Sequence, residues 1–154
     1  THGNGGAYPG QKLQRQRQRM AVYGDGDRGF AMTTALSIRQ PWAWLIVNGY
    51  KNIENRTWST GFRGSFLVHA SKKIDCAGLE WVRLNCPDIV LPMVFETGGI
   101  VGSAEVVGII NTQRDGDFWF TGPYGFVLRN AHPLPFVPML GSTGFFPTDY
   151  EEAP

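Results

Sequence analysis

Three charged side chains lie close together in segment 49–58, between strongly apolar stretches of the chain. If a strand begins here, its period of two places Glu54, Arg56 and Trp58 on one face, with Lys51 at the mouth of the strand. A buried face would force Glu54 and Arg56 to pair, which gives a fixed carboxylate and guanidinium beside an adaptable ammonium. Such a group suits a polar, anionic or amide-rich ligand. The alternative is a solvated strand with an ordinary ion pair, which specifies little.

A histidine and an aromatic segment supply further candidates. His69 falls in a predicted strand over residues 65–70, where a half-buried histidine bonded to a backbone group is the common case. A role in binding or catalysis is the alternative, and the sequence places no serine or cysteine partner beside it. Residues 118–124 are the most aromatic part of the chain and include Trp119 and Tyr124. An exposed ring there would stack a nucleobase and a buried ring would belong to the core; we expect both.

The segment before residue 49 predicts a short helix that leads into this group. Pro41 suits the first turn, where its missing N–H is harmless, and Gly49 can end the helix in a left-handed conformation. Trp42 falls on the apolar stripe of the helix, so core packing and ligand contact are both open for it. Trp44 lies off the stripe and is a candidate for the wall of a groove.

Alternating and periodic patterns predict the remaining elements. Residues 35–39 form a first strand, which places Arg39, a candidate ligand contact, on the face opposite Leu36 and Ile38. A helix over residues 76–85 is capped by Asp75. Further strands are predicted over residues 100–110 and 124–128, and an extended edge segment over residues 132–138, with residues 144–146 closing the sheet.

The spacing of the charged group also resembles a known family. Gly49, Lys51, Glu54 and Arg56 fit the GxKxxExR pattern of the ASCH domain family. Three further segments, 36–43, 64–71 and 122–128, resemble other parts of the family in the same order, so the resemblance runs from about residue 36 to about residue 146. It implies an α+β fold, a small PUA-like β-barrel with two or three short helices. It also implies a role connected with RNA or modified nucleosides.

The resemblance implies recognition of RNA or a modified nucleoside in the barrel cleft. Some bacterial members remove the acetyl group from N4-acetylcytidine, with a catalytic lysine in the GxKxx segment and a threonine nucleophile three residues later. Lys51 matches that lysine, but Glu54 stands in place of the threonine, so the nucleophile is missing. In a revised mechanism the Glu54 carboxylate would activate water, and Lys51 would stabilise the developing oxyanion.

Two alternatives remain open. Similar ASCH proteins have been proposed to cleave single-stranded RNA without metal; here Lys51 or Glu54 would act as the base, and Arg56 or Lys51 as the cation for the phosphate. The other alternative is a non-catalytic binding or interaction module, as in the coactivator that gave the family its name. Whether the protein is an enzyme stays open at this point.

The extent of the resemblance implies a domain over residues 32–148. The chain of 154 residues has 42% hydrophobic residues, enough for one core, and its 20 glycines and 10 prolines favour many short elements. Five basic and two acidic residues precede Met32, whereas nine basic and eleven acidic residues lie from Met32 onward. The domain is therefore not a general binder of nucleic acid, and any RNA contact should be local, around Lys51.

Residues 1–31 lack a hydrophobic period and are expected to be a disordered leader, either an upstream sequence or a basic RNA-binding arm. Met32 is the first candidate for the natural start and Met20 the second; residues 149–154 form an acidic tail. Two cysteines ten positions apart, without a CxxC motif, predict neither a disulfide framework nor a zinc site, and we expect no cofactor. No apolar run is long enough for a membrane span, and we expect a cytoplasmic monomer.

Overall fold

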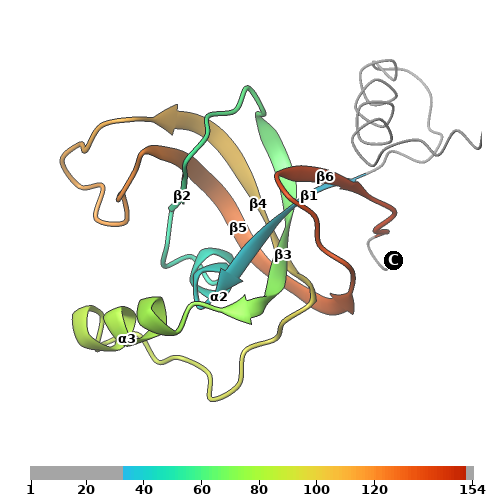
Figure 1. The fold of residues 1–154 in the computed structure, drawn as a ribbon, viewed down its shortest axis with the longest axis horizontal. Helices are drawn as coiled ribbons and strands as arrows, with labels where there is room; N and C mark the ends of the chain where they lie inside the picture. The colour runs from blue at the N-terminus through green and yellow to red at the C-terminus, as the bar shows by residue number, and fades with distance from the viewer. Residues whose placement is uncertain (1–32, 152–154) are drawn as a thin grey trace, which may run out of the picture. The chain divides into compact units, whose positions relative to one another are not determined.

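The computed structural model describes residues 33–151, which form a mixed α+β fold (Figure 1). The leader expected over residues 1–31 and the last three residues of the tail lie outside this range. In order, the elements are β1 (Thr33–Gln40), α2 (Trp42–Val47), β2 (Ile53–Arg56), β3 (Gly64–Ile74), α3 (Cys76–Asn85), β4 (Gly99–Ile110), β5 (Tyr124–Pro138) and β6 (Phe145–Thr148). Every element predicted from the sequence is present, with longer strands than expected for β1, β3 and β5.

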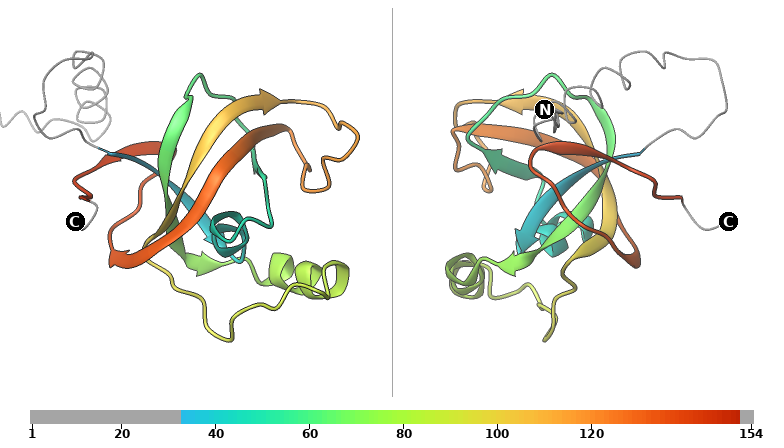
Figure 2. Two further views of the ribbon diagram at one scale, coloured as in Figure 1. Left: turned by 180° about the vertical axis from the view of Figure 1, so that it is seen from behind. Right: turned by 45° about the vertical axis from the view of Figure 1, so that its right-hand side comes forward.

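The six strands form one sheet in the order β2-β5-β4-β3-β1-β6. β1 and β3 are parallel, and the other neighbours are antiparallel. The sheet curls strongly, as Figure 2 shows, but within the described residues β2 and β6 are not hydrogen-bonded to each other. The expected barrel is thus corrected to an open, curled sheet. The two edge strands have only four residues each, and side chains fill the space between them.

Side chains join the two edges of the sheet. The Arg56 guanidinium of β2 donates from Nη2 to the Ser37 carbonyl oxygen of β1 at 2.7 Å. Trp58, just after β2, packs edge-on against Phe145 of β6, with 6.0 Å between ring centroids. Phe62 stacks on the same Phe145 ring at 4.4 Å. These contacts hold β2 beside the opposite end of the sheet without a backbone ladder.

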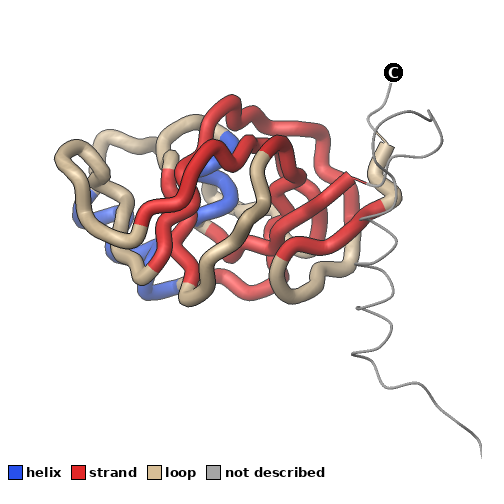
Figure 3. The backbone as a smooth tube through the Cα atoms, turned by 90° about the horizontal axis from the view of Figure 1, so that it is seen from above, coloured by secondary structure: helices blue, strands red, loops and turns tan. Residues whose placement is uncertain are grey.

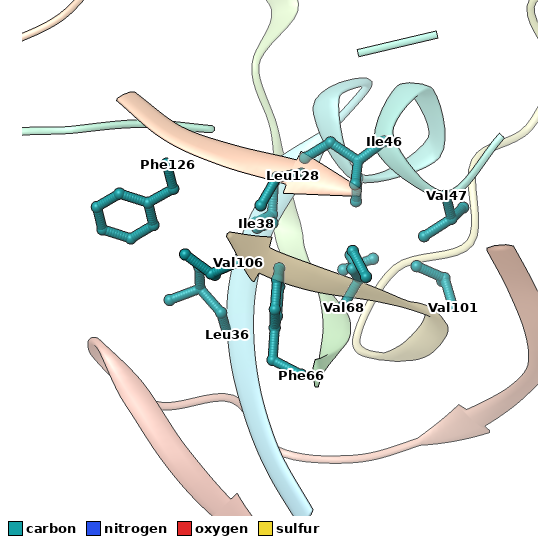
Figure 4. Close-up of a cluster of buried hydrophobic side chains, with 13 residues drawn as sticks. Leu36, Ile38, Ile46, Val47, Phe66, Val68, Val101, Val106, Phe126 and Leu128 are labelled. Carbon is teal, nitrogen blue, oxygen red and sulfur yellow. The ribbon is translucent and has the colours of Figure 1, made fainter. Parts of the chain in front are cut away.

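The main core lies inside the curl (Figure 4). Its buried side chains come from the strands and from α2, and ten of them are labelled in the figure: Leu36, Ile38, Ile46, Val47, Phe66, Val68, Val101, Val106, Phe126 and Leu128. Core positions recur at every second residue in β1, β3 and β5, as the period of a strand requires, and a second buried cluster is formed by Ala35, Leu67, Ile100 and Phe146. Figure 3 shows both helices near one end of the strands.

β5 unites the two segments predicted over residues 124–128 and 132–138. β4 pairs with β5 along most of the length of β5, whereas β2 pairs only with Tyr124–Val127 of that strand. Among the described residues, no strand therefore pairs with the second half of β5 on the side opposite β4. The prolines of β5, which cannot donate to a ladder, occupy this half, as the sequence predicted for an edge.

Candidate functional site

A cavity of about 890 Å³ opens between β1, β2, α3 and the connection from β4 to β5. Seven of the nine residues predicted as site residues line it: Arg39, Trp42, Lys51, Glu54, Arg56, Trp58 and Trp119. They come from segments up to eighty positions apart in the sequence. The cavity is large enough for a nucleoside-sized ligand and lies within the 300–1,000 Å³ typical of small-molecule sites.

Lys51 is buried beside this cavity, with 5% of its side chain exposed. Its ammonium donates a hydrogen bond to the Ile53 carbonyl oxygen, lies 4.0 Å from Glu54 Oε2, and sits 5.7 Å from the centre of the Trp42 ring. Burial lowers the pKa of Lys51; the Glu54 charge opposes this effect and the Arg56 charge adds to it. A lysine with a lowered pKa spends more time as the neutral amine, which can act as a base.

The backbone after α2 fixes the position of Lys51. Gly49 has a positive φ of 81°, which a side chain would strain, and it reverses the chain at the end of the helix. The N–H groups of Tyr50 and Lys51 then donate to the Leu45 carbonyl oxygen at 2.9 and 3.0 Å. The chain continues directly into β2, so the Lys51 side chain is held at the end of that strand.

Glu54 and Arg56 pair on the cavity face of β2, as the sequence predicted. Arg56 Nε lies 3.6 Å from Glu54 Oε1, and the side chains are 21% and 10% exposed. Glu54 Oε2 and Arg56 Nε have no hydrogen-bond partner among the described residues although both atoms are buried. Buried polar atoms without partners are costly, so a donor and an acceptor supplied by a ligand would find ready partners here.

Trp42 forms one wall of the cavity and also packs against the main core, so its core packing is confirmed and its contact with a ligand stays a prediction. Its indole N–H donates to Asp75 Oδ2 at 3.0 Å, while Asp75 Oδ1 accepts from the Gly78 N–H at 2.8 Å and caps α3. These two bonds lower the pKa of Asp75. One carboxylate thus fixes both the Trp42 ring and the start of α3. The expectation for Trp44 is wrong: it stacks on Tyr50 at 5.6 Å and does not line the cavity.

Comparison with known proteins identifies the family of the chain. A family model described as "ASCH domain" matches residues 36–121. The chain belongs to the ASCH domain family. The human protein named Activating signal cointegrator 1 is 27% identical over 118 residues, which is 69% of this chain and 20% of that protein. The mouse protein of the same name is 27% identical over 92 residues, covering 56% of this chain and 16% of that protein.

The chain therefore spans about a fifth of the curated relatives it matches. Among solved structures, a mutant of the ASCH protein from Zymomonas mobilis is 15% identical, with a TM-score of 0.45, over 70% of this chain and 76% of that chain. The crystal structure of ASCH from Zymomonas mobilis is 13% identical, with a TM-score of 0.41, and the match covers 70% of this chain and 73% of that chain.

The structure explains the spacing of the GxKxxExR motif in this ASCH domain. Its glycine permits the reversal after α2, and its lysine is buried beside the cavity. Its glutamate and arginine follow at alternate positions of β2, so both face the cavity. The four residues build one site from a single turn and strand. Trp58 lies just beyond the end of β2, and its ring is 5.9 Å from the Arg56 guanidinium carbon.

Two predicted contacts lie away from the cavity. His69 is 2% exposed; its Nδ1 lies 2.9 Å from Ser37 Oγ and its Nε2 lies 2.7 Å from the Met139 carbonyl oxygen. Since a carbonyl oxygen only accepts, Nε2 carries the proton and Nδ1 accepts from the serine. His69 is therefore a buried histidine bonded to a backbone group, which is the common case that the sequence predicted. Tyr124 is half-buried opposite Arg56 on β5 but does not reach the cavity.

Asn55 is a site residue that sequence reasoning missed. Its Nδ2 donates to the Trp119 carbonyl oxygen at 2.9 Å, and its Oδ1 accepts from the N–H groups of Thr121 and Gly122 at 2.9 and 3.1 Å. One side chain therefore anchors the β4–β5 connection to β2. An asparagine within the motif segment was the only available signal, because its partners are more than sixty positions away.

Trp81 is the second residue that was missed as part of the site. It is 41% exposed and lines the cavity. Among the described residues, no three His, Cys, Asp or Glu side chains gather as metal ligands do. No helix of residues 33–151 is long and apolar enough to cross a membrane.

Proposed function

We propose that this ASCH domain binds a nucleobase of RNA or of a modified nucleoside in the cavity. The observation that carries the proposal is the buried Lys51, Glu54 and Arg56 cluster, which leaves one carboxylate oxygen and one guanidinium N–H without partners beside tryptophan rings. A base offers a planar face for stacking and, on its edge, donors and acceptors for such groups. With nine basic and eight acidic residues, residues 32–148 carry no large positive charge, which favours this local recognition over contacts with many phosphates.

The same groups support hydrolysis of an amide such as that of N4-acetylcytidine. Glu54 would take a proton from a water molecule, whose oxygen attacks the acetyl carbonyl carbon. Lys51 in its protonated form would stabilise the oxyanion, and its place in a low-dielectric wall would strengthen that interaction. Collapse of the tetrahedral intermediate would then release acetate, with a proton delivered to the departing amine of cytidine.

A second candidate is cleavage of single-stranded RNA. The lowered pKa of Lys51 favours it, because a neutral amine can remove the proton of the 2′-hydroxyl. That oxygen would attack the adjacent phosphorus and expel the 5′-oxygen, which would take up a proton from Lys51 or from water and leave as a hydroxyl, with a 2′,3′-cyclic phosphate on the other fragment. Arg56 and Arg39, both at the cavity, would offset the charge of the phosphate in the transition state.

The test uses the purified full chain, with N4-acetylcytidine and a labelled single-stranded RNA as separate substrates. Lys51→Ala should abolish turnover, or weaken binding by about 1–3 kcal/mol for a lost charged hydrogen bond. Lys51→Arg should not restore turnover by general base catalysis, since arginine stays protonated. Lys73→Ala, an exposed lysine on β3 outside the cavity, is the matched control.

The outcomes separate the candidates. Release of acetate identifies an amidohydrolase, and shortened RNA identifies a ribonuclease. Binding without turnover identifies a non-catalytic module, the class to which the name of the human and mouse relatives points. If Lys51→Ala and Lys73→Ala behave alike in every assay, the site does not lie at the motif and the proposal is wrong.

A further inference from the structure

Three aromatic rings gather at the mouth of the cavity, and we call them the aromatic lip: Trp81 of α3 with Phe118 and Trp119 of the β4–β5 connection. The centroid of Trp81 lies 5.9 Å from that of Phe118 and 6.1 Å from that of Trp119, and the last two are 4.9 Å apart. Trp81 and Phe118 are 41% and 59% exposed. Large aromatic rings are thus held together where the solvent reaches them.

The rings of the lip do not stack face to face. The interplanar angles are 39° for Trp81 with Phe118, 61° for Trp81 with Trp119 and 83° for Phe118 with Trp119. Tilted and edge contacts of this kind are favourable in themselves. They also leave ring faces that are not covered by a parallel neighbour within the lip.

The segments that carry the lip are fixed by hydrogen bonds. Asn55 holds the connection at the Trp119 carbonyl oxygen and at two N–H groups that follow. On the other side of Phe118, Arg114 makes two bonds to the Asp117 carboxylate, at 2.6 and 3.1 Å. Asp75 caps the helix that carries Trp81. Exposed rings on anchored segments lose little further entropy when they bind, which favours recognition.

The lip continues the wall of the cavity. Trp81 lies 6.5 Å from Trp42, and Trp42 in turn is 5.7 Å from the Lys51 ammonium. A line of rings therefore runs from the buried lysine to the surface. Arg39, exposed on β1, also lines the cavity and makes no side-chain hydrogen bond or ion pair with a described residue. Its charge is available to a phosphate beside the line.

We propose that the aromatic lip stacks a nucleobase that neighbours the one in the cavity, so that the ligand is a single-stranded oligonucleotide and not a free nucleoside. The inference rests on the proposed function, since the cavity supplies the first base. Stacking rings in line with an uncommitted arginine suit a chain that alternates bases and phosphates. RNA is favoured over a peptide because the lip continues the wall of the cavity in which the first base is proposed to bind, so that one strand would reach both.

The test compares two probes on the full chain: cytidine 5′-monophosphate and a single-stranded octacytidylate RNA of the same base. The RNA should bind the parent protein at least about 10-fold more tightly than the monophosphate, because stacked bases contribute on this order. Trp81→Ala should weaken the octanucleotide about 10- to 100-fold and the monophosphate by a clearly smaller factor, because only the octanucleotide can place a second base on the lip. Trp81→Phe should retain most of the affinity, since it keeps a ring.

Trp44→Ala is the matched control, because Trp44 stacks on Tyr50 outside the cavity. Phe118→Ala, at the most exposed ring of the lip, repeats the test if Trp81→Ala fails to fold. The inference is overturned if the parent protein binds both probes equally tightly, or if the Trp81 and Trp44 variants bind the RNA equally tightly. The proposed function would stand in either case, and the lip would then be assigned to a protein partner. If the parent protein binds neither probe, the inference falls, and the proposed function is then decided by the assay with N4-acetylcytidine. RNA binding that depends on Trp81 but not on Lys51 would support the lip and overturn the proposed function.

Discussion

Replacement of Arg56 by alanine should destabilise the domain by about 3 kcal/mol. The guanidinium makes a charged hydrogen bond to the Ser37 carbonyl oxygen, and a hydrogen bond to a charged group contributes about 1.5–3 kcal/mol. The variant would also leave Glu54, 10% exposed, without its nearest cation. Breaking a buried pair costs roughly 3–5 kcal/mol, but Lys51 remains 4.0 Å from Glu54 Oε2, so we place the total at the lower end.

Urea unfolding followed by circular dichroism measures this change, with the parent protein and Arg63→Ala alongside. Arg63 is a suitable control because it is exposed and bonds only to nearby carbonyl groups, at Thr60 and Phe62. Its replacement should stay within about 0.5 kcal/mol of the parent. When Glu54→Gln is combined with Arg56→Ala, part of the lost unfolding free energy should return, because the double variant has no unpaired carboxylate at position 54. A cost below about 1 kcal/mol for Arg56→Ala would refute both the buried pair and the tie between the sheet edges.

Three further predictions concern Lys51, Asp75 and the contact of α3 with Trp42. Because burial lowers the pKa of Lys51, the unfolded chain keeps the Lys51 proton at pH values where the folded protein has released it, so the free energy of unfolding should rise with pH up to about 10.5 relative to that of Lys51→Met. Urea titrations of both proteins between pH 7 and 10 measure this difference in unfolding free energy. A difference that stays constant with pH would contradict the prediction. Asp75→Ala should lower the free energy of unfolding by about 1–2 kcal/mol at pH 7, because the helix cap and the bond to the Trp42 indole are lost. The difference between parent and variant should shrink as the pH falls through the lowered pKa of Asp75. Thermal melts of both proteins at pH 7 and pH 3 would show or refute this. Gly78→Ala places a methyl group about 2.4 Å from the Trp42 ring and should shift the near-UV circular dichroism, whereas Gly108→Ala, with open space around it, should not; identical spectra would rule out the close approach.

Local patterns predicted those parts of the structure that depend on neighbours in the sequence. The helix predicted over residues 76–85 has those bounds, and its cap is Asp75 as expected. The reversal at Gly49 and the pairing of Glu54 with Arg56 on one strand face are also confirmed. Each of these features is decided within a few residues, by a glycine conformation, a capping carboxylate or the period of two.

Features that depend on distant partners were not predicted. The parallel register of β1 with β3 places Ser37 beside His69, thirty-two positions away, and this explains why a candidate site residue proved to be structural. Trp81 faces the cavity because the β4–β5 connection returns to α3, which no local pattern reports. The prediction of a closed barrel was wrong for a similar reason. Whether the sheet closes depends on the lengths of the edge strands β2 and β6, which the alternating pattern does not report.

The open edges of the sheet have a consequence for how this scaffold can diverge. In a closed barrel, strand number and shear fix the diameter, so the width of the interior changes only when the whole ladder changes. Here, side chains from Arg56 and Trp58 set the separation of β2 from β1 and β6. A single substitution at either position could therefore widen or narrow the entrance while every backbone pairing stays in place. The width of the cavity entrance can thus vary among related sequences without a change of topology.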